Sequence, residues 1–398
     1  MQDFGPIEMV VLQGTSYCNL NCSYCYLSEA SRKTKNKMPD LVISEIARKV
    51  LESPHISDAV RFSWHSGEPM VLDTNYYRNA IKIIKSIREM IGATSVSIDF
   101  DIQTNATLIT QDWCDFISEM NGDLLIGVSC DGPAELHNNY RKNWSGRDSH
   151  ANTERGMLLL AKNGIKFDVT AVVSPETLDA PESFLDYFAK FRTHIREFHF
   201  NLHDEFYIED PDSPIIDKYA KRYERFLKRI LALLNEDVDN RFVPISNFSS
   251  FYNRIFGSSS NAPDYSARAM SRPLKTLSIE SNGDVTTFYA GLTKDECSDL
   301  KDIYGDGKGF VIGNIIEDDF EDMVKSQKLS IIARDFEKSH RMCEAECEYE
   351  ALCSGGYNLI KYRRFNSFEA TETPECRVHV KTFVKTLLDD INAAAQKT

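Results

Sequence analysis

The sequence predicts an α/β fold, a partial (β/α)6 TIM barrel, followed by a C-terminal domain. From residue 8 to about 200, short β-rich runs alternate with longer amphipathic stretches, the pattern of repeated βα units around a parallel sheet. Six such units are visible, whereas a complete barrel has eight. The chain has 398 residues, which is more than one compact core of ordinary size holds.

The predicted strands are short runs of β-branched, aromatic and aliphatic residues. They are 8–12, 59–64, 96–103, 124–129, 167–173 and 197–202. Between and after them lie predicted helices, recognised by apolar residues at helical spacing. These are 41–51, 75–91, 111–120, 151–162, 181–191 and 217–234.

The second half of the chain has a different composition. Residues 235–272 are rich in Ser, Asn and Pro and lack a clear period, which is typical of a connector. Asn282-Gly283 predicts the turn of a hairpin over 275–288, and a helix is expected over 379–394. We therefore expect a barrel over 1–205, a helical connector over 206–272 and a C-terminal domain over 273–398.

Composition and charge exclude two classes of partner. The net charge of -14 repels a polyphosphate backbone, so nucleic acid is not expected to bind. No segment is both apolar and close to 20 residues long, and the N-terminus lacks the features of a secretory signal. We expect a cytoplasmic protein that does not enter a membrane.

Seven of the ten cysteines fall into two groups. One group is Cys18, Cys22 and Cys25, and the other is Cys343, Cys347, Cys353 and Cys376. Structural disulfides are rare in cytosolic chains, so each group calls for another explanation. The isolated Cys114, Cys130 and Cys297 are expected to be small buried hydrophobic residues, although Cys297 remains an alternative ligand.

The N-terminal group, CNLNCSYC, follows the first predicted strand. Active-site loops of barrel folds lie at this end of the strands. Three thiolates from one loop can bind three irons of a four-iron cluster and leave the fourth iron open to another ligand. A zinc site is the alternative, but it needs a fourth ligand at a familiar spacing.

This spacing, with the aromatic Tyr24 before the third cysteine, resembles the radical S-adenosylmethionine (SAM) superfamily. Further motifs of that family follow the later strands: WHSGEP at 64–69, QTNAT at 103–107, SCDGP at 129–133 and NNYRKNWSGR around Arg141. The resemblance implies a [4Fe-4S] cluster on Cys18, Cys22 and Cys25 whose open iron binds SAM. The SAM-binding residues that it implies are Tyr24, Ser66, Gly67, Glu68, Pro69, Gln103, Asn105, Ser129 and Arg141. Ser66 stands where the commonest form of the motif has glycine.

The C-terminal group resembles the SPASM or twitch extension of such enzymes, which holds auxiliary iron-sulfur clusters. A full SPASM domain has seven cysteines, but Thr287 and Phe288 stand where the first is expected. The four cysteines present therefore imply one auxiliary [4Fe-4S] cluster with four thiolate ligands, suited to electron transfer. Four cysteines also suit a closed zinc site, which is the alternative.

Over most of its length the chain is similar to radical SAM/SPASM maturases of ribosomally made (RiPP) precursor peptides, especially cyclophane-forming ones. The similarity implies a precursor-peptide substrate, a reductant such as flavodoxin or ferredoxin, and hydrogen abstraction from a side-chain β-carbon. His203, Asp204 and Glu205, just beyond the sixth strand, are candidates for the base. Formylglycine formation on sulfatases, thioether formation and epimerisation are alternative reactions. A structural metal-binding interaction protein is the non-enzyme alternative.

Overall fold

The computed structural model describes residues 4–203, 213–236, 243–257, 272–294, 297–353 and 358–396. Two compact units make up the chain. Unit 1 consists of residues 1–129, 140–167 and 272–333, and unit 2 of residues 130–139, 168–271 and 334–398. Each unit thus contains segments that are far apart in the sequence. The division at 205 and 272 stays a prediction.

A mixed sheet forms the core of unit 1. Its strands run in the order β4-β3-β2-β1-β7-β8-β9. β1 to β4 run parallel to one another, and β7 is parallel to β1, whereas β8 pairs antiparallel with both β7 and β9. The bounds are β1 (Ile7–Gln13), β2 (Ile56–Trp64), β3 (Ser97–Thr104), β4 (Leu124–Ser129), β7 (Thr276–Glu280), β8 (Asp284–Thr287) and β9 (Gly313–Asn314).

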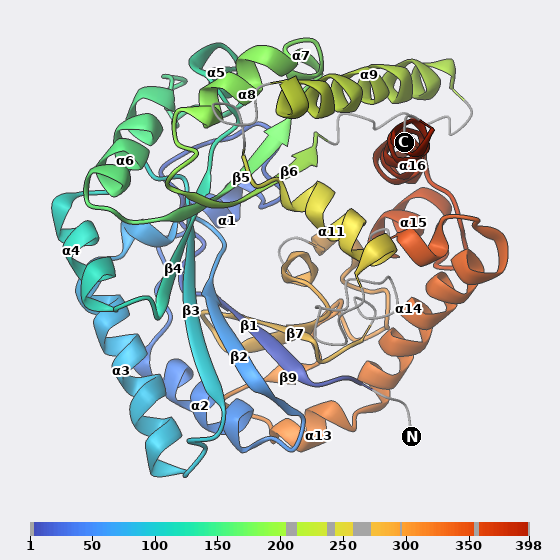
Figure 1. The fold of residues 1–398 in the computed structure, drawn as a ribbon. Helices are drawn as coiled ribbons and strands as arrows, with labels where there is room; N and C mark the ends of the chain where they lie inside the picture. Colours follow the sequence, from blue (N-terminus) through green and yellow to red (C-terminus); the bar gives the residue numbers. More distant parts are fainter. Residues whose placement is uncertain are drawn as a thin grey trace. The chain divides into compact units, whose positions relative to one another are not determined.

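The helices of unit 1 bury their apolar faces. α2 (Asp40–Glu52), α3 (Thr74–Met90) and α4 (Gln111–Glu119) lie on the outer side of β2 to β4 (Figure 1). The Asp73 side chain caps α3 by accepting a hydrogen bond from Tyr76 N at 3.0 Å. The remaining helices are α1 (Glu29–Lys33), η1 (Pro69–Val71), α6 (His150–Lys162), η2 (Ala290–Leu292), η3 (Ser298–Leu300) and α13 (Phe320–Val324).

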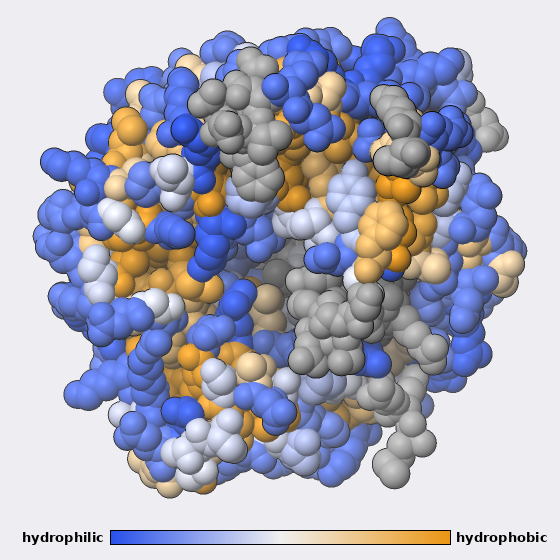
Figure 2. Space-filling model, in the orientation of Figure 1, coloured by the Kyte–Doolittle hydropathy of each residue, from blue (hydrophilic) through white to orange (hydrophobic). Residues whose placement is uncertain are grey.

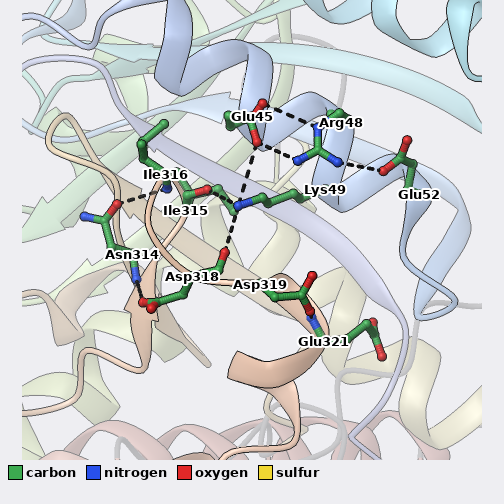
Figure 3. A network of polar contacts seen from close by, with 10 residues as sticks. All are labelled: Glu45, Arg48, Lys49, Glu52, Asn314, Ile315, Ile316, Asp318, Asp319 and Glu321. Atoms are coloured by element: carbon green, nitrogen blue, oxygen red, sulfur yellow. Dashed lines mark hydrogen bonds and ion pairs between the residues drawn. The ribbon is translucent and has the colours of Figure 1, made fainter.

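Lys49 of α2 binds the C-terminal segment of unit 1 (Figure 3). Its Nζ donates to the carbonyl oxygens of Ile315 at 2.6 Å and Asp318 at 2.7 Å. The Asp318 carboxylate in turn accepts a hydrogen bond from Asn314 N at 2.7 Å. This network attaches the segment after the β7–β8 hairpin to a helix more than 260 residues earlier in the chain.

Unit 2 contains two neighbouring strands and most of the C-terminal helices. Phe184, Phe188, Phe198 and Phe226 form an aromatic cluster in its core, with ring centroids 4.6 to 5.9 Å apart. The elements are β5 (Phe167–Val173), β6 (Ile195–Leu202), α5 (Ala134–Tyr140), α7 (Pro175–Leu178), α8 (Pro181–Ala189), α9 (Pro214–Glu236), α11 (Ser246–Phe256), η4 (Glu350–Leu352), α15 (Asn358–Phe365), η5 (Cys376–Lys381) and α16 (Thr382–Ala395). The helix α14 (Gln327–Glu346) belongs to this unit from residue 334 on.

The structure confirms the α/β class, the six predicted strands, the six helices of the βα units, the C-terminal helix and the hairpin, with shifts of a few residues at their ends. The described part of the predicted connector contains α9, which was expected as a helix, and a further helix, α11. Hydrophilic side chains cover most of the outer surface in the view of Figure 2. No helix within the described ranges has both the length and the apolar character that a membrane span requires.

Candidate active site

The N-terminal cysteines lie in the loop after β1, held by the segment 140–144 of the same unit. Asn21 N donates to Lys142 O at 2.7 Å, and Ser23 N donates to Tyr140 O at 3.0 Å. The indole Nε1 of Trp144 donates to Cys18 O at 2.8 Å. These hydrogen bonds fix the cysteine loop to the segment 140–144, although about 120 residues separate the two in the sequence.

None of the three cysteines forms a disulfide, and Cys22 and Cys25 act electrostatically on Cys18. Burial raises the pKa of Cys18, and Glu68, Cys22 and Cys25 raise it further, while a hydrogen bond from Leu20 N to its sulfur opposes the rise. A cation bound by these thiols would remove the cost of deprotonating them, because a coordinating thiol loses its proton outright. The donor set thus fits an iron cluster. Within the described residues, no three His, Cys, Asp or Glu side chains converge as a single metal ion requires.

The loop after β2 has an unusual backbone. Ser66 has φ 87° and Gly67 has φ 58°, both in the left-handed region. A Cβ on Gly67 would lie 2.6 Å from Tyr17 O, so a residue with a side chain cannot fit there without displacing the cysteine loop. Ser66 fits sterically but bears the strain of its φ angle, which explains why glycine is the usual residue at this position of the motif.

Glu68 is the buried acid of the site, with 1% of its surface exposed. Its carboxylate accepts hydrogen bonds from Thr104 Oγ1 at 2.6 Å, Asn105 N at 2.7 Å and Met70 N at 3.0 Å. Burial raises the pKa of Glu68, whereas these hydrogen bonds and the charge of Arg141 lower it. The carboxylate thus connects the β2 loop to the end of β3, next to Pro69 at the start of η1.

The predicted SAM-binding residues at the ends of β3 and β4 form two separate sets of hydrogen bonds. Gln103 Nε2 donates to Ser129 Oγ at 2.9 Å, so these two residues lie side by side. Asn105 instead joins Asn19 and Thr107: its Nδ2 donates to Asn19 Oδ1 at 2.8 Å, and its Oδ1 accepts from Thr107 Oγ1 at 2.6 Å. Asn105 therefore braces the cysteine loop.

Arg141 supplies positive charge to the same region. Its guanidinium carbon lies 5.4 Å from the centroid of the Tyr24 ring, and its charge acts on Glu68. Only 8% of Arg141 is exposed. A buried acid and a buried arginine in one unit match the two charges of an amino acid, an ammonium and a carboxylate.

The predicted base residues are only partly described. His203 follows β6 in unit 2, is 9% exposed, and its backbone N donates to Val173 O at 2.9 Å. Asp204 and Glu205 lie outside the described residues. Their role as a base stays a prediction.

The four C-terminal cysteines all belong to unit 2, and Cys343 and Cys353 act electrostatically on Cys376. Burial raises the pKa of Cys376 to about 12, and Cys353 and Cys343 raise it as well, while Lys381 lowers it. Cys347 N donates to Cys343 O at 2.8 Å at the end of α14. Lys361 Nζ lies 3.1 Å from Cys343 Sγ. The donor set fits a second iron-sulfur cluster, for the reason given for the first.

The remaining cysteines behave as buried hydrophobic residues. Cys114, Cys130 and Cys297 are at most 1% exposed. The Cys297 thiol is in unit 1 and donates to Gly291 O at 3.4 Å.

Sequence reasoning missed several residues that contact the two cysteine groups or the loops beside them. Thr104 and Trp144 lie inside motifs already quoted, but nothing in a motif shows which distant group a side chain contacts. Nothing in the sequence around Lys361, a short basic segment, indicates that this residue contacts a cysteine. Only the fold reveals these roles.

Comparison with known proteins identifies a family and several relatives. The model of the radical SAM superfamily matches residues 12–188. An uncharacterized protein of Synechocystis sp. is 31% identical over 387 residues, which is 97% of this chain and 92% of that protein. A cysteine-type anaerobic sulfatase-maturating enzyme of Clostridium perfringens is 26% identical over 360 residues, 88% of either chain.

Two solved structures share the fold. Native anSMEcpe with bound AdoMet and Cp18Cys peptide has a TM-score of 0.74 at 23% identity, covering 99% of this chain and 100% of that one. Streptococcus suis SuiB bound to precursor peptide SuiA has a TM-score of 0.58 at 17% identity, covering 94% of this chain and 76% of that one.

Proposed function

Because the chain belongs to the radical SAM superfamily and is a radical SAM enzyme, we propose that it forms a carbon–carbon crosslink of the cyclophane type in a precursor peptide. The observation that carries the proposal is the arrangement of Glu68, Arg141 and the three-cysteine loop in one unit. Cys18, Cys22 and Cys25 would hold a four-iron cluster, which together with SAM would supply a carbon radical able to abstract hydrogen.

The chain's own residues bind and orient SAM. Arg141 is suited to the SAM carboxylate, and Glu68 to its ammonium, since each side chain carries the opposite charge. The neighbouring Gln103 and Ser129 offer donors and acceptors for the ribose hydroxyls. This division of roles holds the reactive carbon in a fixed orientation, which is the main contribution of a protein to radical chemistry.

Two features support a peptide substrate and a single auxiliary cluster. The solved structures with the same fold include one with bound Cp18Cys peptide and one with a precursor peptide. Thr287 and Phe288, 1% exposed each, occupy the hairpin position where a larger SPASM domain has a cysteine. We therefore assign one auxiliary cluster to the four C-terminal cysteines, in a SPASM-like domain that follows a partial barrel.

The reaction balances with a single electron acceptor. The β-carbon loses a hydrogen atom, the resulting carbon radical bonds to the arene, and the ring then loses one electron and one proton to regain aromaticity. The auxiliary cluster would supply the electron acceptor, and a base among His203, Asp204 and Glu205 would take the proton. Flavodoxin or ferredoxin would supply the electron for SAM cleavage.

Formylglycine formation is the second candidate, because the Clostridium perfringens relative is a sulfatase-maturating enzyme and the similarity covers 88% of its length. Mass separates the two reactions for a cysteine substrate, whose sulfur is replaced by oxygen, but not for a serine substrate, since oxidation of serine to formylglycine also removes two hydrogens. The test therefore offers the anaerobic enzyme two peptides, a precursor with aromatic three-residue cores and a sulfatase peptide. A hydrazide probe then labels any aldehyde.

The proposal expects loss of two hydrogens from the precursor, no hydrazide labelling, and missing backbone fragments within one three-residue core in tandem mass spectra. Hydrazide labelling of the sulfatase peptide alone would replace the proposal with the second candidate. Iron content provides the accompanying control: about eight irons per chain are expected for two clusters. Replacing Cys18, Cys22 and Cys25 by Ala should remove about half of the iron and all SAM cleavage.

A further inference from the structure

Lys361 of α15 is a buried cation beside the C-terminal cysteines. It is 5% exposed, and its Nζ lies 2.9 Å from Ser339 O and 3.1 Å from Cys343 Sγ. The adjacent Ser339 hydroxyl donates to Asn358 Oδ1 at 2.7 Å, which fixes α15 against α14. The ammonium group is therefore held at the sulfur by two packed helices.

This placement is costly unless a negative charge faces the lysine. No carboxylate of the described residues forms an ion pair with Lys361, and its acceptors are one carbonyl oxygen and one thiol. Burial of an ammonium group without an anionic partner disfavours the folded state strongly. A thiolate that ligates an iron cluster would be that partner.

Two further cations act on the other three cysteines. The charge of Lys381 acts on Cys347 and Cys376, and that of Arg254 acts on Cys353. Lys381, however, is ion-paired with Glu372, and Arg254 Nη1 donates to Leu352 O at 2.5 Å. Lys361 is thus the member of this set that combines deep burial, direct contact with a sulfur and no carboxylate partner among the described residues.

We propose that Lys361 is a positioning residue that raises the reduction potential of the auxiliary cluster held by Cys343, Cys347, Cys353 and Cys376. The inference rests on the proposed function, in which this cluster accepts an electron from the substrate. Reduction adds a negative charge to the cluster, and a nearby fixed cation stabilises the reduced form more than the oxidised form. The lysine therefore favours electron transfer from the substrate to the cluster.

The test measures the potential of the auxiliary cluster alone. Replacing Cys18, Cys22 and Cys25 by Ala removes the signal of the first cluster, and EPR-monitored potentiometric titration then follows the second. In this background Lys361→Gln should lower the ratio of reduced to oxidised cluster at a fixed potential at least tenfold. For a one-electron couple this corresponds to a reduction potential lower by about 59 mV. Lys361→Arg, which keeps the charge, should change the ratio less than twofold.

Lys338→Gln is the matched control. Lys338 lies on α14 too, but its side chain is 48% exposed and pairs with Glu369, so its loss should leave the ratio unchanged. A fully iron-loaded Lys361→Gln variant with the unaltered ratio would overturn the inference. Loss of iron from both Lys361→Gln and Lys361→Met would overturn it too, by showing that the lysine is needed to assemble the cluster.

No peptide is needed for this titration, so its result is independent of the crosslinking assay. A missing crosslink with a shifted potential would refute the proposed reaction and keep the role of Lys361. A triple-alanine variant without iron or EPR signal would refute the auxiliary cluster and this inference, and leave the SAM site standing.

Discussion

Lys49 allows a sharp test of what holds unit 1 together, because its neighbour in the sequence serves as a control. Lys49→Met keeps the apolar stem of the side chain, which is 11% exposed, and removes the hydrogen bonds to Ile315 O and Asp318 O (Figure 3). Hydrogen bonds to charged groups contribute about 1.5–3 kcal/mol each. Since one of the two is solvent-exposed, we expect a total loss of about 2–3 kcal/mol.

Arg48→Met is the matched change. Arg48 is 44% exposed and pairs with Glu45 and Glu52 on the helix surface, where ion pairs contribute about 0–1 kcal/mol. All three tryptophans of the chain belong to unit 1, so their fluorescence follows the urea unfolding of this unit. With a slope of about 2–3 kcal/mol per molar urea, Lys49→Met should lower the midpoint by roughly 1 M. Equal midpoints for the two variants would refute the reasoning.

Three further predictions address the cysteine loops and the C-terminal helix. Gly67→Ala places a Cβ 2.6 Å from a backbone oxygen at a positive φ, so we expect about 2–3 kcal/mol of destabilisation and at least tenfold weaker SAM binding by calorimetry. Ser66→Gly should instead stabilise the chain slightly, by up to about 1 kcal/mol, and a neutral Gly67→Ala would contradict both expectations. Burial lowers the pKa of His379 to about 4, below its unfolded value near 6.5, so stability should fall as pH falls from 6.5 to 4. His379→Gln should flatten this profile by about 2 kcal/mol in urea titrations at pH 4.5 and 7, and an unchanged slope would show that another group titrates. Cys347→Ala with Cys353→Ala should leave about half of the iron and intact SAM cleavage but little crosslinked peptide, and a folded double variant crosslinking at the normal rate would exclude the auxiliary cluster as required acceptor.

The strands were predictable because their apolar runs are short and bounded by motifs, whereas α14 was not predicted. Its buried residues Leu329, Ile332, Ala333 and Phe336 do have helical spacing. The charged residues between them dilute this pattern, and the cysteines that follow suggest a loop-rich metal domain. The helix forms because its apolar face is buried, which depends on partners that the local sequence does not specify.

The motifs predicted which residues line the site, but not which residues they bond to. A motif places Asn105 at the end of β3, where a cofactor contact is expected, but the motif contains nothing about Asn19, 86 residues earlier. In the structure the Asn105 amide oxygen accepts hydrogen bonds from Thr107 N and Thr107 Oγ1, and its nitrogen donates to Asn19. An amide side chain offers two donors and accepts two hydrogen bonds, so the contacts described leave it one N–H. Any contact of this side chain with SAM must therefore use that N–H, and Asn105→Asp should disturb the cysteine loop as well as the cofactor.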